Sequence, residues 1–156
     1  MQRKNINRGY MTLHVWQNAI LLYKEVCRVF RPFSYELKKI VSQEIASVDS
    51  IHRNIAEGYC RKSINEYLHF LNIAKGSLGE SVSGIYTYYK AEQINKETFE
   101  LLDKLSYQIE NQLINLIKSI ELKKEKGNWN DCLTFMEKEG FYNINPTIQQ
   151  SELNIQ

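Results

Sequence analysis

The sequence predicts an all-α protein, an antiparallel up-down four-helix bundle. Apolar residues recur at every third or fourth position through four long segments, which is the period of an amphipathic helix. Only two prolines and seven glycines interrupt the 156 residues, so long helices suit the composition. The connections between the segments are short, and short connections favour antiparallel neighbours.

The first helix is expected over residues 13–30. Its apolar stripe consists of Trp16, Ala19, Ile20, Tyr23, Val26, Cys27 and Phe30. Pro32 ends the helix, because its ring removes a backbone donor and disfavours helix in the preceding residue. The second helix is expected over residues 35–60, with Ser34 as its N-cap. Gly58 lies near its end, where a left-handed residue is often needed.

The third helix is expected over residues 64–91, because Ser63 and Glu66 have the spacing of a capping box. Three glycines fall inside it, at positions 76, 79 and 84, and each costs a helix about 1 kcal/mol relative to alanine. We expect close approach by a neighbouring helix to offset these three costs, with Ser77, Ser81 and Ser83 extending the small surface. A kink is the alternative.

The fourth helix is expected to begin at Asn95 and to end before Gly127. Residues 1–12 are predicted to be a flexible basic arm, residues 13–126 the bundle, and residues 127–156 a short helix and polar tail. Further apolar residues lie off the main stripes of the later helices, at Ile73, Tyr86, Tyr88, Leu101 and Ile114. This second apolar face indicates either self-association or a broad core.

Three widely spaced cysteines, Cys27, Cys60 and Cys132, are expected to be reduced thiols. The N-terminus lacks an apolar signal core, and no apolar run approaches the ~20 residues that a membrane span needs. We therefore expect a cytoplasmic protein with no membrane association.

The sequence contains no complete catalytic or metal-binding motif, so we expect neither an enzyme nor a cofactor. Glu66 and His69 have the Glu-x-x-His spacing of di-iron bundles, but the second copy that such a site needs is absent. A helical nuclease would need an Arg and a His held rigidly together. The nearest match, Arg8 and His14, begins in the expected flexible arm. No metal site is expected.

Basic residues gather in the first part of the chain. Residues 1–62 hold 11 Lys and Arg against five Asp and Glu, whereas residues 127–156 hold one against four. Such clusters suit contact with phosphates. The candidate nucleic-acid-binding residues are Arg28, Arg31, Lys38 and Lys39 around the first turn, and Arg53, Arg61 and Lys62 towards the other end of the second helix.

Three blocks of sequence carry a resemblance to a known family. They are Val15-Trp-Gln17, then Asn54-Ile-Ala-Glu-Gly58 followed by Arg61, Ser63, Glu66 and Phe70, and then Ile73-Ala-Lys-Gly-Ser-Leu-Gly-Glu80. In these blocks the chain resembles, over residues 13–122, the four-helix-bundle family of 23S rRNA intervening-sequence proteins. That family also includes the accessory variability determinant of diversity-generating retroelements. The chain departs from the family pattern at residues 49–53, where Ser-Ile-Pro-Ser usually precedes the Asn-Ile-Ala-Glu-Gly block.

The resemblance implies a homopentameric barrel of four-helix protomers without an active site of its own. It also implies, for the retroelement members, assistance to a reverse transcriptase and its template RNA. From the residues themselves we expect Asn54 and Glu57 to tie the second helix to the third, Gly58 to permit the turn, and Glu80 to join a similar tie.

These observations favour a nucleic-acid-binding accessory protein, with RNA or DNA as its partner. The alternative is an oligomeric protein-interaction scaffold that does not bind nucleic acid, in which the tail docks a partner through Trp129 to Phe141.

Overall fold

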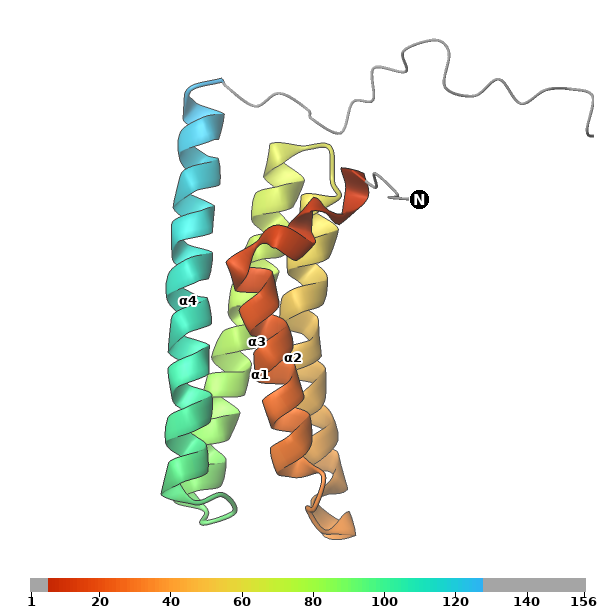
Figure 1. The fold of residues 1–156 in the computed structure, drawn as a ribbon, viewed down its shortest axis with the longest axis vertical. Helices are drawn as coiled ribbons and strands as arrows, with labels where there is room; N and C mark the ends of the chain where they lie inside the picture. Colours follow the sequence, from red (N-terminus) through yellow and green to blue (C-terminus); the bar gives the residue numbers. More distant parts are fainter. Residues whose placement is uncertain (1–5, 128–156) are drawn as a thin grey trace, which may run out of the picture.

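The computed structural model describes residues 6–127, and in that range it confirms an all-α four-helix bundle without strands. Successive helices run in opposite directions (Figure 1). The elements are η1 (Ile6–Thr12), α1 (His14–Phe30), η2 (Tyr35–Leu37), α2 (Lys38–Tyr59), α3 (Ile64–Lys90) and α4 (Lys96–Glu125), where η marks a 3-10 helix.

Two of the predicted helix-end signals operate as expected. The side chain of Asn95 accepts a hydrogen bond from the backbone N–H of Thr98 at 2.8 Å, which caps α4. Gly127 has a φ of 63°, the left-handed conformation that ends a helix. Ser63 occupies the N-cap position of α3 but makes no side-chain capping bond, so the predicted capping box is not formed there.

The core lies between all four helices, because α1 and α3 each pack against both α2 and α4. Burial of one Leu or Ile side chain contributes about 1.5–3 kcal/mol. The buried apolar residues are Val15, Ala19, Leu22, Val26, Phe30, Val48, Ile51, Ile55, Tyr67, Leu71, Ala74, Leu78, Ile85, Ile94, Leu102, Ile109, Leu113, Ile117 and Ile120.

The expected flexible arm differs in the structure, where Ile6–Thr12 forms the 3-10 helix η1 against α1 and α2. The Tyr10 ring meets Trp16 and Tyr59 edge-on, with centroid distances of 5.4 and 6.1 Å. These aromatic contacts supply the apolar burial that a short local sequence pattern does not reveal. Residues 1–5 of the expected arm and residues 128–156 of the expected tail lie outside the described residues.

The expected helix approach at Gly76 and Gly79 is wrong within the protomer. A Cβ added at either position would meet nothing within 4 Å, because both residues lie on the exposed side of α3. Gly84 behaves as expected instead, since a Cβ there would clash with the Glu44 carboxylate of α2. Within residues 6–127, no helix combines the length and apolar character needed to cross a membrane.

Candidate nucleic-acid interface

The turn between α1 and α2 carries the first group of candidate residues at one end of the bundle (Figure 1). Aromatic side chains fix this turn to the core. The Phe30 ring lies 4.6 Å from that of Phe33 and 5.3 Å from that of Tyr88 on α3, between ring centroids. Because the turn is anchored from inside, Arg31 on one side of it and Lys38 on the other are held near each other.

The four basic side chains of this turn are all exposed. The Arg28 Nε donates to Glu25 Oε2 at 2.8 Å, an i,i+3 pair on α1. No ion pair with any described residue is formed by Arg31, Lys38 or Lys39. We call Arg31, Lys38 and Lys39 together the basic turn.

The structure does not bring the second group of candidates to the same place. The 22 residues of α2 span ~33 Å, so Arg61 and Lys62 lie at the opposite end of the bundle from the basic turn. Arg53 forms an ion pair with Asp49. Arg61 forms one with Glu57 and lies 3.8 Å from Glu66 at the start of α3.

Arg61 also stacks over Phe70 of α3, with its guanidinium carbon 4.9 Å from the ring centroid. Arg61 thus links Glu57 at the end of α2 with Glu66 at the start of α3, and Glu57 contributes to this connection through Arg61. Exposed ion pairs of this kind contribute little individually, at about 0–1 kcal/mol. In this protein they hold the Arg61 side chain at the turn between α2 and α3.

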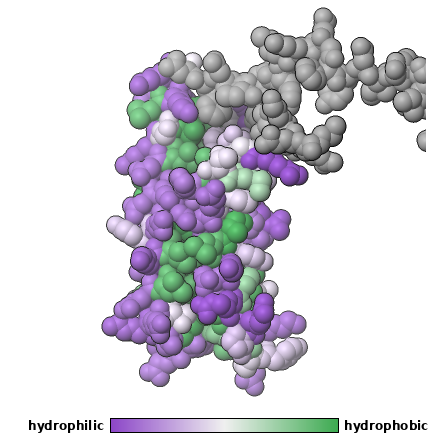
Figure 2. Space-filling view, viewed as in Figure 1, coloured by the Kyte–Doolittle hydropathy of each residue, from purple (hydrophilic) through white to green (hydrophobic). Residues whose placement is uncertain are grey.

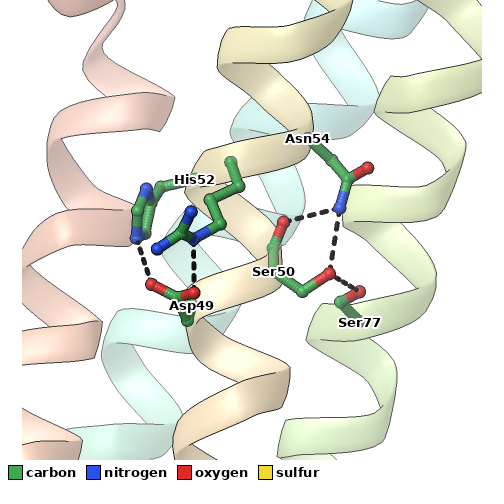
Figure 3. Close-up of polar contacts among 6 residues, drawn as sticks. Asp49, Ser50, His52, Asn54 and Ser77 are labelled. Atoms are coloured by element: carbon green, nitrogen blue, oxygen red, sulfur yellow. Dashed lines mark hydrogen bonds and ion pairs between the residues drawn. The ribbon is translucent and has the colours of Figure 1, made fainter.

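Asn54 hydrogen-bonds to Ser50 of its own helix, and Ser50 makes the contact with the middle of α3, so the tie differs from the expected one between Asn54 and the start of α3 (Figure 3). The Asn54 amide nitrogen donates to the Ser50 carbonyl at 2.7 Å and to the Ser50 hydroxyl at 2.9 Å. The Ser50 hydroxyl in turn lies 2.9 Å from that of Ser77 in the middle of α3. Glu80 joins a second tie, accepting a hydrogen bond from Gln43 of α2 at 3.2 Å.

The expectation of a left-handed turn at Gly58 is wrong. Among the described residues, positive φ occurs only at Glu92 and Gly127, and Gly58 lies inside α2. The glycine is needed for space instead, because a Cβ there would lie 2.9 Å from the Cβ of Phe70 and 2.9 Å from the Tyr67 ring. Gly58 therefore sets how closely α2 approaches α3.

The segment that departs from the family pattern, residues 49–53, forms a local charged cluster on α2 (Figure 3). One oxygen of the Asp49 carboxylate forms an ion pair with Arg53. The other oxygen lies 3.1 Å from the His52 Nε2. The His52 ring points towards α1, where it meets Trp16 and Tyr23 edge-on at 6.4 and 5.8 Å. The spacing of Asp49, His52 and Arg53 at i, i+3 and i+4 was the signal that could have revealed this cluster.

Glu44 is a buried carboxyl that the sequence interpretation missed. It lies on α2 facing α3, where the Ser81 hydroxyl donates to its Oε1 at 2.5 Å and the Tyr88 side chain also hydrogen-bonds to it. Burial raises the pKa of Glu44 to about 7, against the effect of these hydrogen bonds and with a smaller contribution from the nearby Glu80 charge. Burial also raises the pKa of Tyr88 to about 12.

The described residues contain neither a metal-binding group nor a disulfide between cysteines. No group of three or more His, Cys, Asp or Glu side chains that could hold a metal ion occurs in residues 6–127. Glu66 and His69 are both exposed on α3. Cys27 and Cys60 are not joined in a disulfide, and Cys132 lies outside the described range.

Comparison with known proteins gives a family and a fold. The family model described as 23S rRNA-intervening sequence protein matches residues 11–115, which include α1–α3 and most of α4. The chain is also similar to a crystal structure of a protein of unknown function from the S23 ribosomal protein family of Bacteroides thetaiotaomicron. The two share 24% identity and a TM-score of 0.62, over 67% of this chain and 95% of that one. The search of curated proteins found no match.

Proposed function

The chain belongs to the 23S rRNA-intervening sequence protein family, and we propose that it is a non-enzymatic accessory protein that binds nucleic acid. The observation that carries this proposal is the basic turn. Arg31, Lys38 and Lys39 lie together at one end of the bundle without an ion pair to any described residue. A cluster of uncompensated cations attracts phosphates and releases their counterions on binding.

The finer proposal is that the protein works as a homopentamer beside a reverse transcriptase and its template RNA, as the accessory variability determinants do. Two features support it. The sequence blocks around Asn54–Gly58 and Ile73–Glu80 resemble those of the family that includes the accessory variability determinants. The exposed face of α3 also carries small and apolar residues suited to contact with another copy.

The proposal is tested by reversing the charge of the turn. A variant with Arg28, Arg31, Lys38 and Lys39 all changed to Glu should bind a structured RNA more weakly than the natural chain. The slope of log K against log salt should flatten by about one for each phosphate that the variant no longer neutralises. Fluorescence anisotropy at several salt concentrations measures both quantities.

A control variant carries the same change in net charge elsewhere on the bundle. Its four substitutions, on exposed lysines of α3 and α4, are Lys75→Glu, Lys104→Glu, Lys118→Glu and Lys123→Glu. We expect a much smaller decrease in affinity for this control. Equal decreases in both variants would mean that only net charge matters, and unchanged affinity in the first variant would remove the proposal.

An oligomeric protein-interaction scaffold remains a second candidate, and exposed apolar residues favour it. Figure 2 shows apolar side chains in a strip between α4 and α1, and the exposed apolar residues of these helices include Leu21 and Leu101. Such a strip suits a protein partner. A natural chain that assembles but binds neither RNA nor DNA at low salt would favour the scaffold over the nucleic-acid-binding protein.

A further inference from the structure

Tyr35 is the most exposed large apolar side chain of the described residues. It is 84% exposed at the start of η2, inside the basic turn. Its backbone position is fixed, since the Leu37 N–H donates to the Ser34 carbonyl at 3.0 Å and the Lys38 N–H donates to the Tyr35 carbonyl. The ring is therefore presented to solvent from an ordered turn.

Two hollows adjoin Tyr35, and both are lined by basic residues. The first, of about 600 Å³, is lined by Tyr35 and Glu36 together with Lys38, Lys39, Ser42, Gln43 and Ala46. The second, of about 350 Å³, is lined by Tyr35 and Lys38 together with Phe30, Arg31, Phe33, Ser34 and Val41. Tyr35 and Lys38 line both hollows, so they stand between them. The Lys38 Nζ lies 5.4 Å from the centroid of the Tyr35 ring.

We infer that Tyr35 is a stacking platform for an unpaired base of a single-stranded nucleic acid. The inference rests on the proposed function, because the same basic turn supplies the phosphate contacts. An exposed aromatic ring between cations matches the two needs of single-strand binding, a π-face for the base and positive charge for the backbone. A base that stacks on Tyr35 has Lys38 on one side and Arg31 or Lys39 within the adjoining hollows for its flanking phosphates.

The same geometry disfavours a duplex. Bases inside a duplex are already stacked and paired, so their faces are not open to a protruding ring. Glu36 adds a negative charge to this site, because it lines the larger hollow together with Lys38 and Lys39. A carboxylate repels phosphates but accepts a hydrogen bond from a base amino group. The phosphates are therefore expected towards Arg31 and Lys38, with the base edge nearer Glu36.

The test compares Tyr35→Ala and Tyr35→Phe with the natural chain. Binding is measured by anisotropy to a labelled single-stranded RNA of about twelve nucleotides and to its blunt duplex, at several salt concentrations. Because stacking on one aromatic side chain contributes about five- to 140-fold in affinity, Tyr35→Ala should weaken single-strand binding by that factor. Its salt slope should stay unchanged, since no charge is removed. Tyr35→Phe should bind within about twofold of the natural chain.

Tyr107→Ala serves as the matched control, because Tyr107 is 67% exposed on α4, away from the basic turn. The stacking inference alone is overturned if the natural chain binds with a clear salt dependence but Tyr35→Ala binds equally well. It is also overturned if Tyr35→Ala weakens duplex binding as much as single-strand binding, or if Tyr35→Phe binds as weakly as Tyr35→Ala. Absence of any binding by the natural chain overturns the proposed function itself.

Discussion

Glu44 shows how one residue makes the stability of the bundle depend on pH. Its carboxyl is only 3% exposed between α2 and α3, and its pKa is about 7 in the folded chain. In the unfolded chain the pKa of a glutamate is about 4.3. Between these values the unfolded chain releases the proton while the folded chain keeps it. The contribution of Glu44 to stability is therefore fully present below pH ~4 and lost as pH rises through about 7.

We predict that Glu44→Gln flattens this pH dependence and stabilises the protein at pH 8. Glutamine keeps an oxygen that accepts from the Ser81 hydroxyl, but it has no proton to lose. The difference in the free energy of unfolding between variant and natural chain should grow by at most about 3 kcal/mol between pH 5 and pH 8.

Urea denaturation at a series of pH values measures this difference. Glu80→Gln is the control, since Glu80 is exposed beside the same contact and should change the profile far less. A Glu44→Gln variant whose stability parallels that of the natural chain at every pH would show that Glu44 is ionised in the folded protein.

At the scale of helices, Gly58 determines the contact between α2 and α3. We predict that Gly58→Ala lowers the free energy of unfolding by about 1–2 kcal/mol. Overpacking against Phe70 and Tyr67 costs about 1–3 kcal/mol, and the better helix propensity of alanine offsets up to about 1 kcal/mol of it. Thermal and urea unfolding both report the change.

Gly79→Ala is the matched substitution for that experiment. It gives the same gain in helix propensity, but nothing lies within 4 Å of the added Cβ in the protomer. It should therefore stabilise a protomer by up to about 1 kcal/mol. If both alanine variants change stability by the same amount and sign, the close approach at Gly58 has no energetic consequence.

The helices themselves could be predicted from the sequence because each has a local signal. Apolar period, Pro32, the Asn95 cap and Gly127 place all four helices within a few residues of their observed ends. The side of each helix that is buried was harder to predict. In α1 the run from Ile20 to Tyr23 is apolar on every side, so periodicity favoured Ile20 and Tyr23, whereas the structure buries Leu22 completely. Which of these side chains is buried depends on where α2 and α4 pack against α1.

The candidate site could be predicted only in part, for the same reason. Arg31 and Lys38 are close in sequence across one turn, so their proximity follows from the turn alone. Arg53 and Arg61 are paired to acidic residues one helical turn away, which local spacing would have revealed. The burial of Glu44 depends on Ser81 and Tyr88, 37 or more positions away, and no local pattern indicates it.

At the scale of the whole molecule, the exposed face of α3 is the feature that a single protomer leaves unexplained. Ile73, Gly76, Gly79, Ser83 and Tyr86 follow one another at intervals of three or four residues, so they share one side of the helix. All five are exposed. Two glycines inside a helix cost about 2 kcal/mol relative to alanine, and no contact within the protomer offsets that cost. Close packing against another copy would supply the offset.

We therefore predict that Gly76→Leu prevents assembly without disturbing the protomer. Native mass spectrometry of the natural chain should give a mass near five times the 18.4 kDa of one chain, and the variant should give mainly the single-chain mass. Far-UV circular dichroism should be the same for both, because a side chain at Gly76 meets nothing within 4 Å in the protomer. Asn115→Leu adds a leucine to the exposed side of α4 and should assemble normally. A Gly76→Leu variant that still forms the natural assembly would show that this face of α3 is not where the copies meet.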